Sequence, residues 1–353
     1  MSTLAAILLA ASTLPGVAQL PPADSAMLLP LQDRHGDAAL AQYVNEALQA
    51  ELGRNLQLVE TTGLRDELRR LRLRDAGDID PSDLRRLAET FGVQWLISVT
   101  LHDANETPEP QFVISAWAHR VKDDNLAWAG FESAAGLSTE RSLGRDRIEL
   151  LENLAAATIR RLIADLGDSL EGKRGTAPRA AADDEGFLLR PVTVPDLGAV
   201  AVIPFESVTG ASPAESGELI TALARATLHR HGATLLHPGR VNAILRRRGV
   251  FMRGELDPLA RAALRIGGAA VHILTGMVAI YESPRSIEPN PHVEFSARLV
   301  EVDSGRIVWI SGQERTGWDR PGMFGRDKVY DAGTLATSMM ESLVTGFLEP
   351  PQR

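Results

Sequence analysis

The sequence contains no cysteine, few aromatic residues and no excess of positive charge. Without cysteine it has no thiol nucleophile and no cysteine to which a lipid anchor could be attached. Its formal net charge of −9 argues against general affinity for nucleic acid or an anionic membrane, since both favour a basic face. Uncharged apolar runs long enough to cross a bilayer are also lacking. We therefore expect no nucleic-acid partner and no membrane-spanning segment in the mature chain.

The first 19 residues differ from the rest of the sequence. Residues 4–14 form an apolar run without charge, and small residues follow at 15–18, which is typical of a secretory signal peptide. The amino-terminal region lacks Lys and Arg, so a start without defined structure is the alternative. We predict a signal peptide over 1–19 and export to the periplasm, without lipidation through cysteine.

The second half of the sequence repeats the first. Trp309 follows Trp128 by 181 positions, and the residues before them keep the same spacing. The matched residues are Pro108, Pro110, Ser115, Ala116 and Val121 in the first copy and Pro289, Pro291, Ser296, Ala297 and Val302 in the second. Two Asp-Pro pairs, at 80–81 and 257–258, lie 177 apart, so small gaps separate the blocks. A repeat of this length predicts two similar domains.

Each copy shows the same order of predicted elements. A short strand (26–31 or 200–205), a helix (39–52 or 215–231) and a second strand (56–59 or 233–236) come first. Two helices follow, at 64–73 and from 80 in the first copy, and at 241–248 and from 257 in the second; each Asp-Pro pair marks a helix start. Glycines at 53 and 232 are expected to end helices in the left-handed conformation.

Three strands and a closing helix complete each copy. The strands are predicted at 93–101, 111–121 and 126–133, and again at 271–280, 292–302 and 306–314. Val293, Phe295 and Leu299 alternate with polar residues, which places one face of the strand on a core. Closing helices are predicted at 146–166 and 327–347. The fold class is α/β, with two tandem domains, each a mixed β-sheet in the order β-α-β-α-α-β-β-β-α packed with helices.

The domains are predicted over 24–167 and 197–349. The segment 168–196 is rich in Gly, Ala, Pro and charge and is interpreted as a linker with a short strand at 187–189.

Several phrases of the second copy resemble a group of bacterial envelope domains. These are VAVIPFES, ATLLHPGRVNAIL, LARAALRIGGAAVHILTGMV and ARLVEVDSGRIVWISG. They resemble the domain shared by the curli-secretion protein CsgG, the amino-terminal domain of TolB and the penicillin-binding-protein activator LpoB. The positions that carry the resemblance are Pro204, Phe205, Gly268, Ala269, Gly276, Val302, Asp303, Gly305, Val308 and Trp309. The first copy departs further, since Leu31 replaces the Phe and Lys122 replaces the Asp.

The resemblance implies an envelope protein and specifies fold more than activity. The loops at 105–110 and 283–291 are too short for the membrane hairpins of a CsgG-type pore, and no propeller repeats follow as in TolB. With a CsgG-type pore and a TolB homologue disfavoured, the expected function is that of a periplasmic binding or assembly factor.

The sequence offers no catalytic or metal-binding set. It lacks a Walker loop and a GxSxG elbow, and the histidine spacings match no zinc site. Gly267-Gly268 precedes a strand, which favours a packing turn over a phosphate loop. Trp128 and Trp309 are interpreted as core residues. We therefore expect no enzyme activity and no cofactor.

Arginine-rich helices and one tryptophan are the candidate partner-binding residues. They are Arg69, Arg70, Arg246, Arg247, Arg248 and Trp318. The arginines have two interpretations: offsetting a helix dipole while covering apolar surface, or docking an acidic partner. Trp318 lies in a Gly-rich loop and is expected to be exposed.

The function predicted is a non-catalytic periplasmic binding or assembly factor of the cell envelope, acting on an envelope protein or an anionic envelope polymer. One alternative is a small-ligand sensor or transport accessory protein that binds its ligand between the two domains. Another is a homo-oligomeric secretion component. A pocket with convergent polar groups would favour the sensor, and continuous packing of the copies would not.

Overall fold

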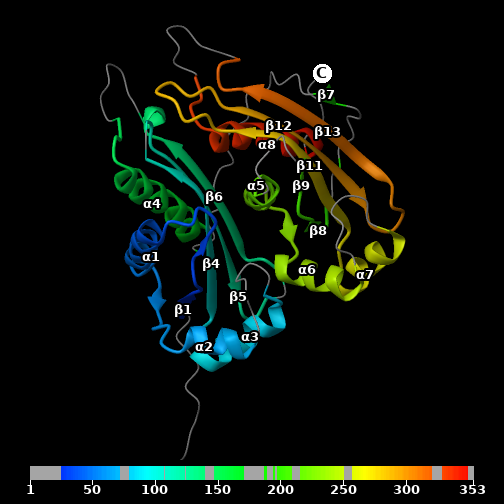
Figure 1. Cartoon of the computed structure of the whole chain (residues 1–353). Coiled ribbons are helices and arrows are strands. Elements are labelled where there is room, and N and C mark those ends of the chain that lie inside the picture. The colour runs from blue at the N-terminus through cyan, green and yellow to red at the C-terminus, as the bar shows by residue number, and fades with distance from the viewer. Residues whose placement is uncertain are drawn as a thin grey trace, which may run out of the picture.

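The computed structural model describes residues 25–71, 79–106, 108–123, 125–139, 147–170, 187–188, 194, 197–208, 215–249, 257–319 and 328–348. The predicted signal peptide and most of the predicted linker lie outside these residues. Helices and strands are labelled as in Figure 1.

The first copy forms a mixed six-stranded sheet in the order β3-β1-β4-β5-β6, with β2 beside β4. Its strands are β1 (Ser25–Leu28), β2 (Gln32–Asp33), β3 (Gln57–Leu58), β4 (Trp95–Asn105), β5 (Gln111–Arg120) and β6 (Trp128–Ala135). Its helices are α1 (Ala38–Leu52), α2 (Leu64–Arg70), α3 (Pro81–Phe91) and α4 (Leu151–Leu170), with a 3₁₀ turn over Leu137–Thr139. Strand β1 is parallel to β3 and β4, whereas β4, β5 and β6 form an antiparallel meander.

The second copy repeats this arrangement in a seven-stranded sheet, β10-β8-β11-β12-β13-β7, with β9 beside β11. Its strands are β8 (Ala199–Val202), β9 (Glu206–Ser207), β10 (Thr234–Leu235), β11 (His272–Glu282), β12 (His292–Glu301) and β13 (Ile307–Thr316). Its helices are α5 (Ser216–Arg230), α6 (Pro238–Arg247), α7 (Pro258–Gly268) and α8 (Ala332–Leu348). The short strand expected in the linker is β7 (Phe187–Leu188), which pairs antiparallel with β13. The predicted α/β fold class with two similar units is therefore confirmed.

Local signals in the sequence account for most helix ends. Asp80 accepts a hydrogen bond from the Ser82 amide at the start of α3, and Asp257 accepts one from Ala260 at the start of α7. Gly232 has the expected positive φ of 80° after α5. The prediction for Gly53 is wrong: its φ is −64°, because the turn after α1 stays right-handed.

The two domains stack in layers rather than lying end to end (Figure 1). Helices α1 and α4 cover one face of the first sheet through a core that includes Leu48, Trp128 and Leu162. The other face of the first sheet packs against α5 and α8, and these two helices also cover the inner face of the second sheet. Helices α5 and α8 are therefore sandwiched between both sheets.

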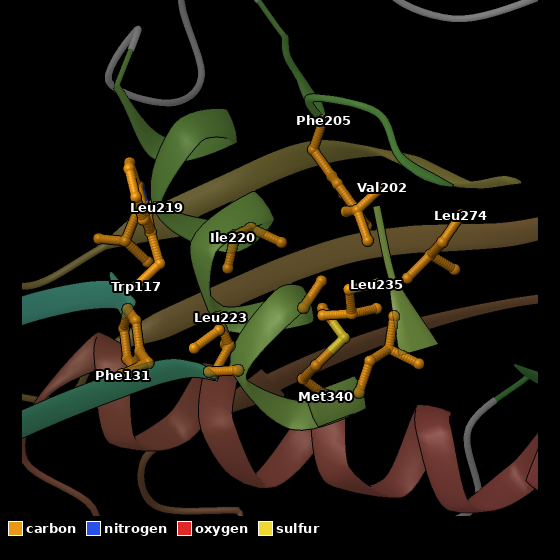
Figure 2. Close-up of a cluster of buried hydrophobic side chains, with 14 of the residues drawn as sticks. Trp117, Phe131, Val202, Phe205, Leu219, Ile220, Leu223, Leu235, Leu274 and Met340 are labelled. Atoms are coloured by element: carbon orange, nitrogen blue, oxygen red, sulfur yellow. The ribbon is translucent and has the colours of Figure 1, made fainter. Parts of the chain in front are cut away.

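A continuous apolar core joins the two domains at this layer. Figure 2 shows Trp117 and Phe131 of the first sheet beside Leu219 and Leu223 of α5. Helix α5 is largely buried around its whole circumference, whereas α1 keeps a polar exposed side. Backbone pairing extends the junction, since the Leu126 amide donates to the Leu235 carbonyl at 3.0 Å. Packing of this kind makes the pair one structural unit.

The corresponding face of the second sheet has different residues. Val113, Trp117 and Phe131 lie on the face of the first sheet that packs against α5 and α8, and their matches 181 positions later are Glu294, Arg298 and Gly312. Glu294, Ser296 and Arg298 are half-buried and face away from the core, as their alternation with Val293 and Phe295 predicted. Helices α6 and α7 cover one end of this face through Ile244, Leu264 and their neighbours. The second sheet thus keeps a polar outer surface where the first sheet holds a domain.

Candidate interaction surfaces

The arginines of α2 are held in short-range ion pairs on their own helix. Arg69 lies 3.3 Å from Asp66, and the Arg70 Nε donates to Glu67 at 2.7 Å. This hydrogen bond from Arg70 lowers the pKa of Glu67 and raises the pKa of Arg70. Both arginines are exposed, but each has its charge balanced one turn away. Helix α2 therefore presents little net charge to a partner.

The arginines of α6 lie in a different setting. Arg246, Arg247 and Arg248 follow each other at the carboxyl end of the helix and are all exposed. Helix α6 contains no acidic residue, and Arg247 and Arg248 form no ion pair with any residue that the structure describes. Their position at a helix carboxyl end favours cations. Both interpretations of these arginines fit this position, because an exposed guanidinium group can offset the helix dipole and can also bind an acidic partner.

Helices α6 and α7 pack against each other. The Arg240 Nε, near the start of α6, donates to the Gly267 carbonyl at the end of α7 over 2.8 Å. Ile244 of α6 contacts the same end of α7, where a Cβ on Gly267 would lie 3.1 Å from its Cδ1. We call these two helices with their capping residues the α6–α7 hairpin.

The α6–α7 hairpin differs in formal charge from the matching pair of helices in the first domain, α2 and α3. With their caps, α6 and α7 contain six arginines and one aspartate, a formal charge of +5. With their caps, α2 and α3 contain five arginines and five acidic residues, a formal charge of zero. The whole chain is negative at −9, so the α6–α7 hairpin is a local positive region on an acidic protein.

Trp318 is less available than its loop position predicted. The side chain is half-buried, and its indole nitrogen is buried without a hydrogen-bond partner among the described residues. The Lys328 ammonium group lies 4.2 Å from the ring centroid, a cation–π contact. The following residues, 320–327, lie outside the described part of the chain. Trp318 therefore already has a partner inside the protein.

The histidines serve structural roles in the described residues. His231 and Arg230 at the end of α5 both pair with Glu341 of α8. His237 begins α6 by accepting from the Gly239 amide at 3.2 Å, and its ring contacts those of Trp117 and His119 across the domain junction. Within the described residues, no three His, Asp or Glu side chains are placed to hold a metal ion.

Polar groups are also buried at the domain junction. His102 hydrogen-bonds Ser115 at 2.7 Å, and burial lowers its pKa to about 3, with the charge of Arg34 acting in the same direction. Asp331 accepts from Ser133 at 2.5 Å and from the Thr334 amide at 2.7 Å, yet burial raises its pKa. The bond between Ser133 and Asp331 crosses the junction, that between His102 and Ser115 lies within the first sheet, and the apolar core is continuous beside them. This packing does not favour a ligand held between the domains.

Trp128 and Trp309 are core residues, as predicted. Each is almost completely buried: Trp128 donates to Asp165 at 2.9 Å, and Trp309 meets Phe347 edge to face with centroids 5.0 Å apart. Among the described helices, none combines the length and apolar character needed to cross a bilayer.

No known family model matches this sequence, and no curated protein matches it. Solved structures that resemble part of the chain include the PelC dodecamer from Paraburkholderia phytofirmans, with 20% identity over 47% of this chain and 94% of that one, at a TM-score of 0.30. Lipoprotein GNA1162 from Neisseria meningitidis has 16% identity over 42% of this chain and 99% of its own, at a TM-score of 0.29. The LpoB carboxyl-terminal domain from Escherichia coli has 16% identity over 35% of this chain and 84% of that domain, at a TM-score of 0.26.

These likenesses are too low to identify a partner or an activity. LpoB is among the proteins that the sequence phrases resemble, whereas the resemblance to CsgG and TolB stays a prediction.

The sequence reasoning did not identify the exposed side of α7. Leu259 and Ile266 are 70% and 85% exposed, the latter the most exposed large apolar side chain among those described. A comparison of the two copies could have found these residues, because the positions 177 residues earlier are polar, Ser82 and Glu89.

Proposed function

We propose that this chain is a non-catalytic protein of the bacterial cell envelope that binds an acidic partner protein through the α6–α7 hairpin. The observation that carries the proposal is the formal charge of +5 on this hairpin, against zero on the matching hairpin of the first domain. Arg240 and Arg265 have partners inside the domain, at the Gly267 carbonyl and Asp303, whereas Arg247 and Arg248 form no ion pair among the described residues. The charge of these two arginines therefore does not serve to hold the hairpin on its domain. Guanidinium groups bind carboxylates through two parallel hydrogen bonds, which suits recognition of an acidic surface.

Export to the periplasm is supported by the signal-peptide pattern at 1–19 and by the resemblance of the second copy to envelope domains.

Charge reversal tests the proposal. A variant with Arg246→Glu, Arg247→Glu and Arg248→Glu is compared with wild type for partner capture by crosslinking in the envelope of producing cells. We expect capture to be lost, while circular dichroism and the melting temperature remain close to wild type because these side chains are exposed. The matched control is Arg69→Glu with Arg70→Glu on α2, which should leave capture unchanged.

Unchanged capture in the α6 variant would overturn the proposal. An anionic envelope polymer on the same arginines would be distinguished from a protein because protease digestion would leave the captured material intact.

A further inference from the structure

Helix α7 exposes an apolar stripe along one side. Leu259, Ala262 and Ile266 are spaced three and four residues apart, which places them on one face of the helix. All three are exposed, and Leu259 and Ile266 retain 70% and 85% of their free surface. The opposite side of α7 is buried through Ala260, Ala263 and Leu264. The stripe is therefore additional to the face that holds α7 on its domain.

The matching helix of the first domain has a polar surface at the same positions. Helix α3 has the same length, the same Asp-Pro start and, 177 positions earlier, Ser82, Arg85 and Glu89. These three residues are exposed as well. The fold thus accepts polar residues there, and the apolar stripe of α7 calls for a different explanation. Apolar side chains aligned on a surface helix are typical of a contact with another molecule.

Charge determines which molecule fits the stripe. The exposed arginines 246–248 lie at the carboxyl end of α6, which packs against α7, and the whole α6–α7 hairpin has a formal charge of +5. A second copy placed hairpin against hairpin would bring two such charges together, which opposes self-association there. A purely anionic polymer would satisfy the arginines but not the stripe. The combination suits a ligand with apolar and acidic residues on neighbouring faces.

We propose that the α7 stripe and the α6 arginines together dock an acidic amphipathic helix of a partner protein. The proposal rests on the proposed function and specifies the partner's chemistry. The stripe runs over eight residues, a rise of about 10 Å or two helical turns, so it fits apolar side chains at positions i, i+3 or i+4, and i+7 of the docked helix. Glutamate or aspartate beside these positions pairs with the guanidinium groups.

Site-specific photocrosslinking in the full-length chain tests this proposal. A benzophenone amino acid is introduced at Leu259 or at Ile266, and in control variants at Ser82 or at Glu89. After irradiation of producing cells, the crosslinked partner peptide is sequenced by mass spectrometry. We expect the two α7 positions to capture one segment with acidic residues and a helical apolar spacing, and the α3 positions not to capture it.

A second variant separates the stripe from the arginines. The triple change Leu259→Ser, Ala262→Arg and Ile266→Glu installs the α3 residues, which the same fold already tolerates. With a crosslinker at Arg247, this variant should reduce capture of the segment at least tenfold, whereas the distant exposed change Ile287→Ser should not. Unchanged capture after the stripe replacement would overturn the helix-docking proposal while leaving the arginine surface, and so the proposed function, intact.

Other captured species would also overturn it. These are a second copy of this chain, a lipid, or a segment without acidic or apolar periodicity. Absence of any reproducible crosslink at Leu259 and Ile266 would do the same.

Discussion

At the residue scale, the junction between the domains depends on contacts that leave no space for a side chain. Gly239, in the first turn of α6, lies against the backbone before α3, where a Cβ would approach the Ile79 carbonyl oxygen to 1.9 Å. Gly333 has a similar role, since a Cβ there would lie 2.2 Å from the Ser133 Oγ. Both contacts join the second domain to the first. Glycine is needed at these positions for close approach, not for an unusual backbone angle.

The change Gly239→Ala should destabilise the protein by roughly 1–3 kcal/mol, because the new methyl group forces two backbone segments apart. Urea unfolding gives the free energy. The control is Gly346→Ala in α8, where a Cβ meets nothing within 4 Å and the helix should gain about 0.5–1 kcal/mol. Equal stability of Gly239→Ala and wild type would contradict the close packing of α6 on the first domain.

Buried histidine makes stability depend on pH. Burial lowers the pKa of His102 to about 3, below an unfolded value of about 6.5. Between these values the unfolded chain binds the proton and the folded chain does not. The contribution of His102 is therefore complete above about pH 6.5 and is lost as pH falls toward 3. Burial raises the pKa of Asp331, whose contribution has the opposite sign and declines as pH rises above about 3.8.

Replacing His102→Gln should flatten the loss of stability in acid. One histidine adds a slope of at most about 1.4 kcal/mol per pH unit between pH 6.5 and 3. The measurement is the free energy of urea unfolding at pH 4, 5, 6 and 7 for the variant and wild type. Parallel curves for the two proteins would show that His102 already titrates normally in the folded state.

At the element scale, capping residues define where the paired helices begin. The Asp80 and Asp257 carboxylates each accept a backbone hydrogen bond in the first turn, and proline follows each at the next position. Sequence alone predicted both starts because an N-cap needs only local geometry. The same pair provides a matched test across the two domains.

Asp80→Ala and Asp257→Ala should each cost about 1 kcal/mol, since an amide of the first turn loses its acceptor. The double variant should show the sum, because the two helix starts lie in different domains and share no hydrogen bond. Chemical unfolding of the three variants gives the comparison. A double variant far less stable than the sum would mean that the helix starts are coupled through the junction.

The limits of sequence reasoning are clearest for α5. Leu219 and Leu223 lie one turn apart in the helix predicted over 215–231, and both are buried in the core. The extra apolar residues Ile220 and Ala224 on its other sides were not interpreted, because their burial depends on a second sheet that periodicity cannot place. The strand meander was predictable since alternation is local. The stacking of the domains was not, because it depends on contacts about 100 residues apart.

The sequence identified the arginines as candidate binding residues but did not show which of them are already ion-paired. Arg70 and Arg247 look alike in the sequence, and only the structure shows Glu67 pairing with the first. The exposure of the apolar residues of α7 could not be predicted, because it depends on which face of the helix packs against the domain.

At the scale of the whole molecule, one apolar core connects both sheets through α5 and α8. Removal of either domain would expose a large apolar surface, including Trp117 on one side or Leu223 on the other. The two domains should therefore unfold together.

Calorimetry should show a single unfolding transition for the full chain. Leu223→Ala in the shared core and Leu48→Ala in the core beneath α1 each create a cavity costing roughly 2–5 kcal/mol. Both should lower the midpoint of that same transition. Two separable transitions, with each variant affecting only one, would contradict joint unfolding.

The corresponding faces of the two sheets also fix the order of the copies along the chain. The face with Val113, Trp117 and Phe131 accepts a domain, and the face with Glu294 and Arg298 does not. A chain with the two halves exchanged would contain the same residues. However, α5 could pack on the apolar face of the other sheet only if the segment that joins the halves had a suitable length and direction. The two similar halves therefore differ in role: the first sheet presents the apolar face, and α5 of the second half packs on it. A third copy added after the second would meet a polar surface and find no place to pack.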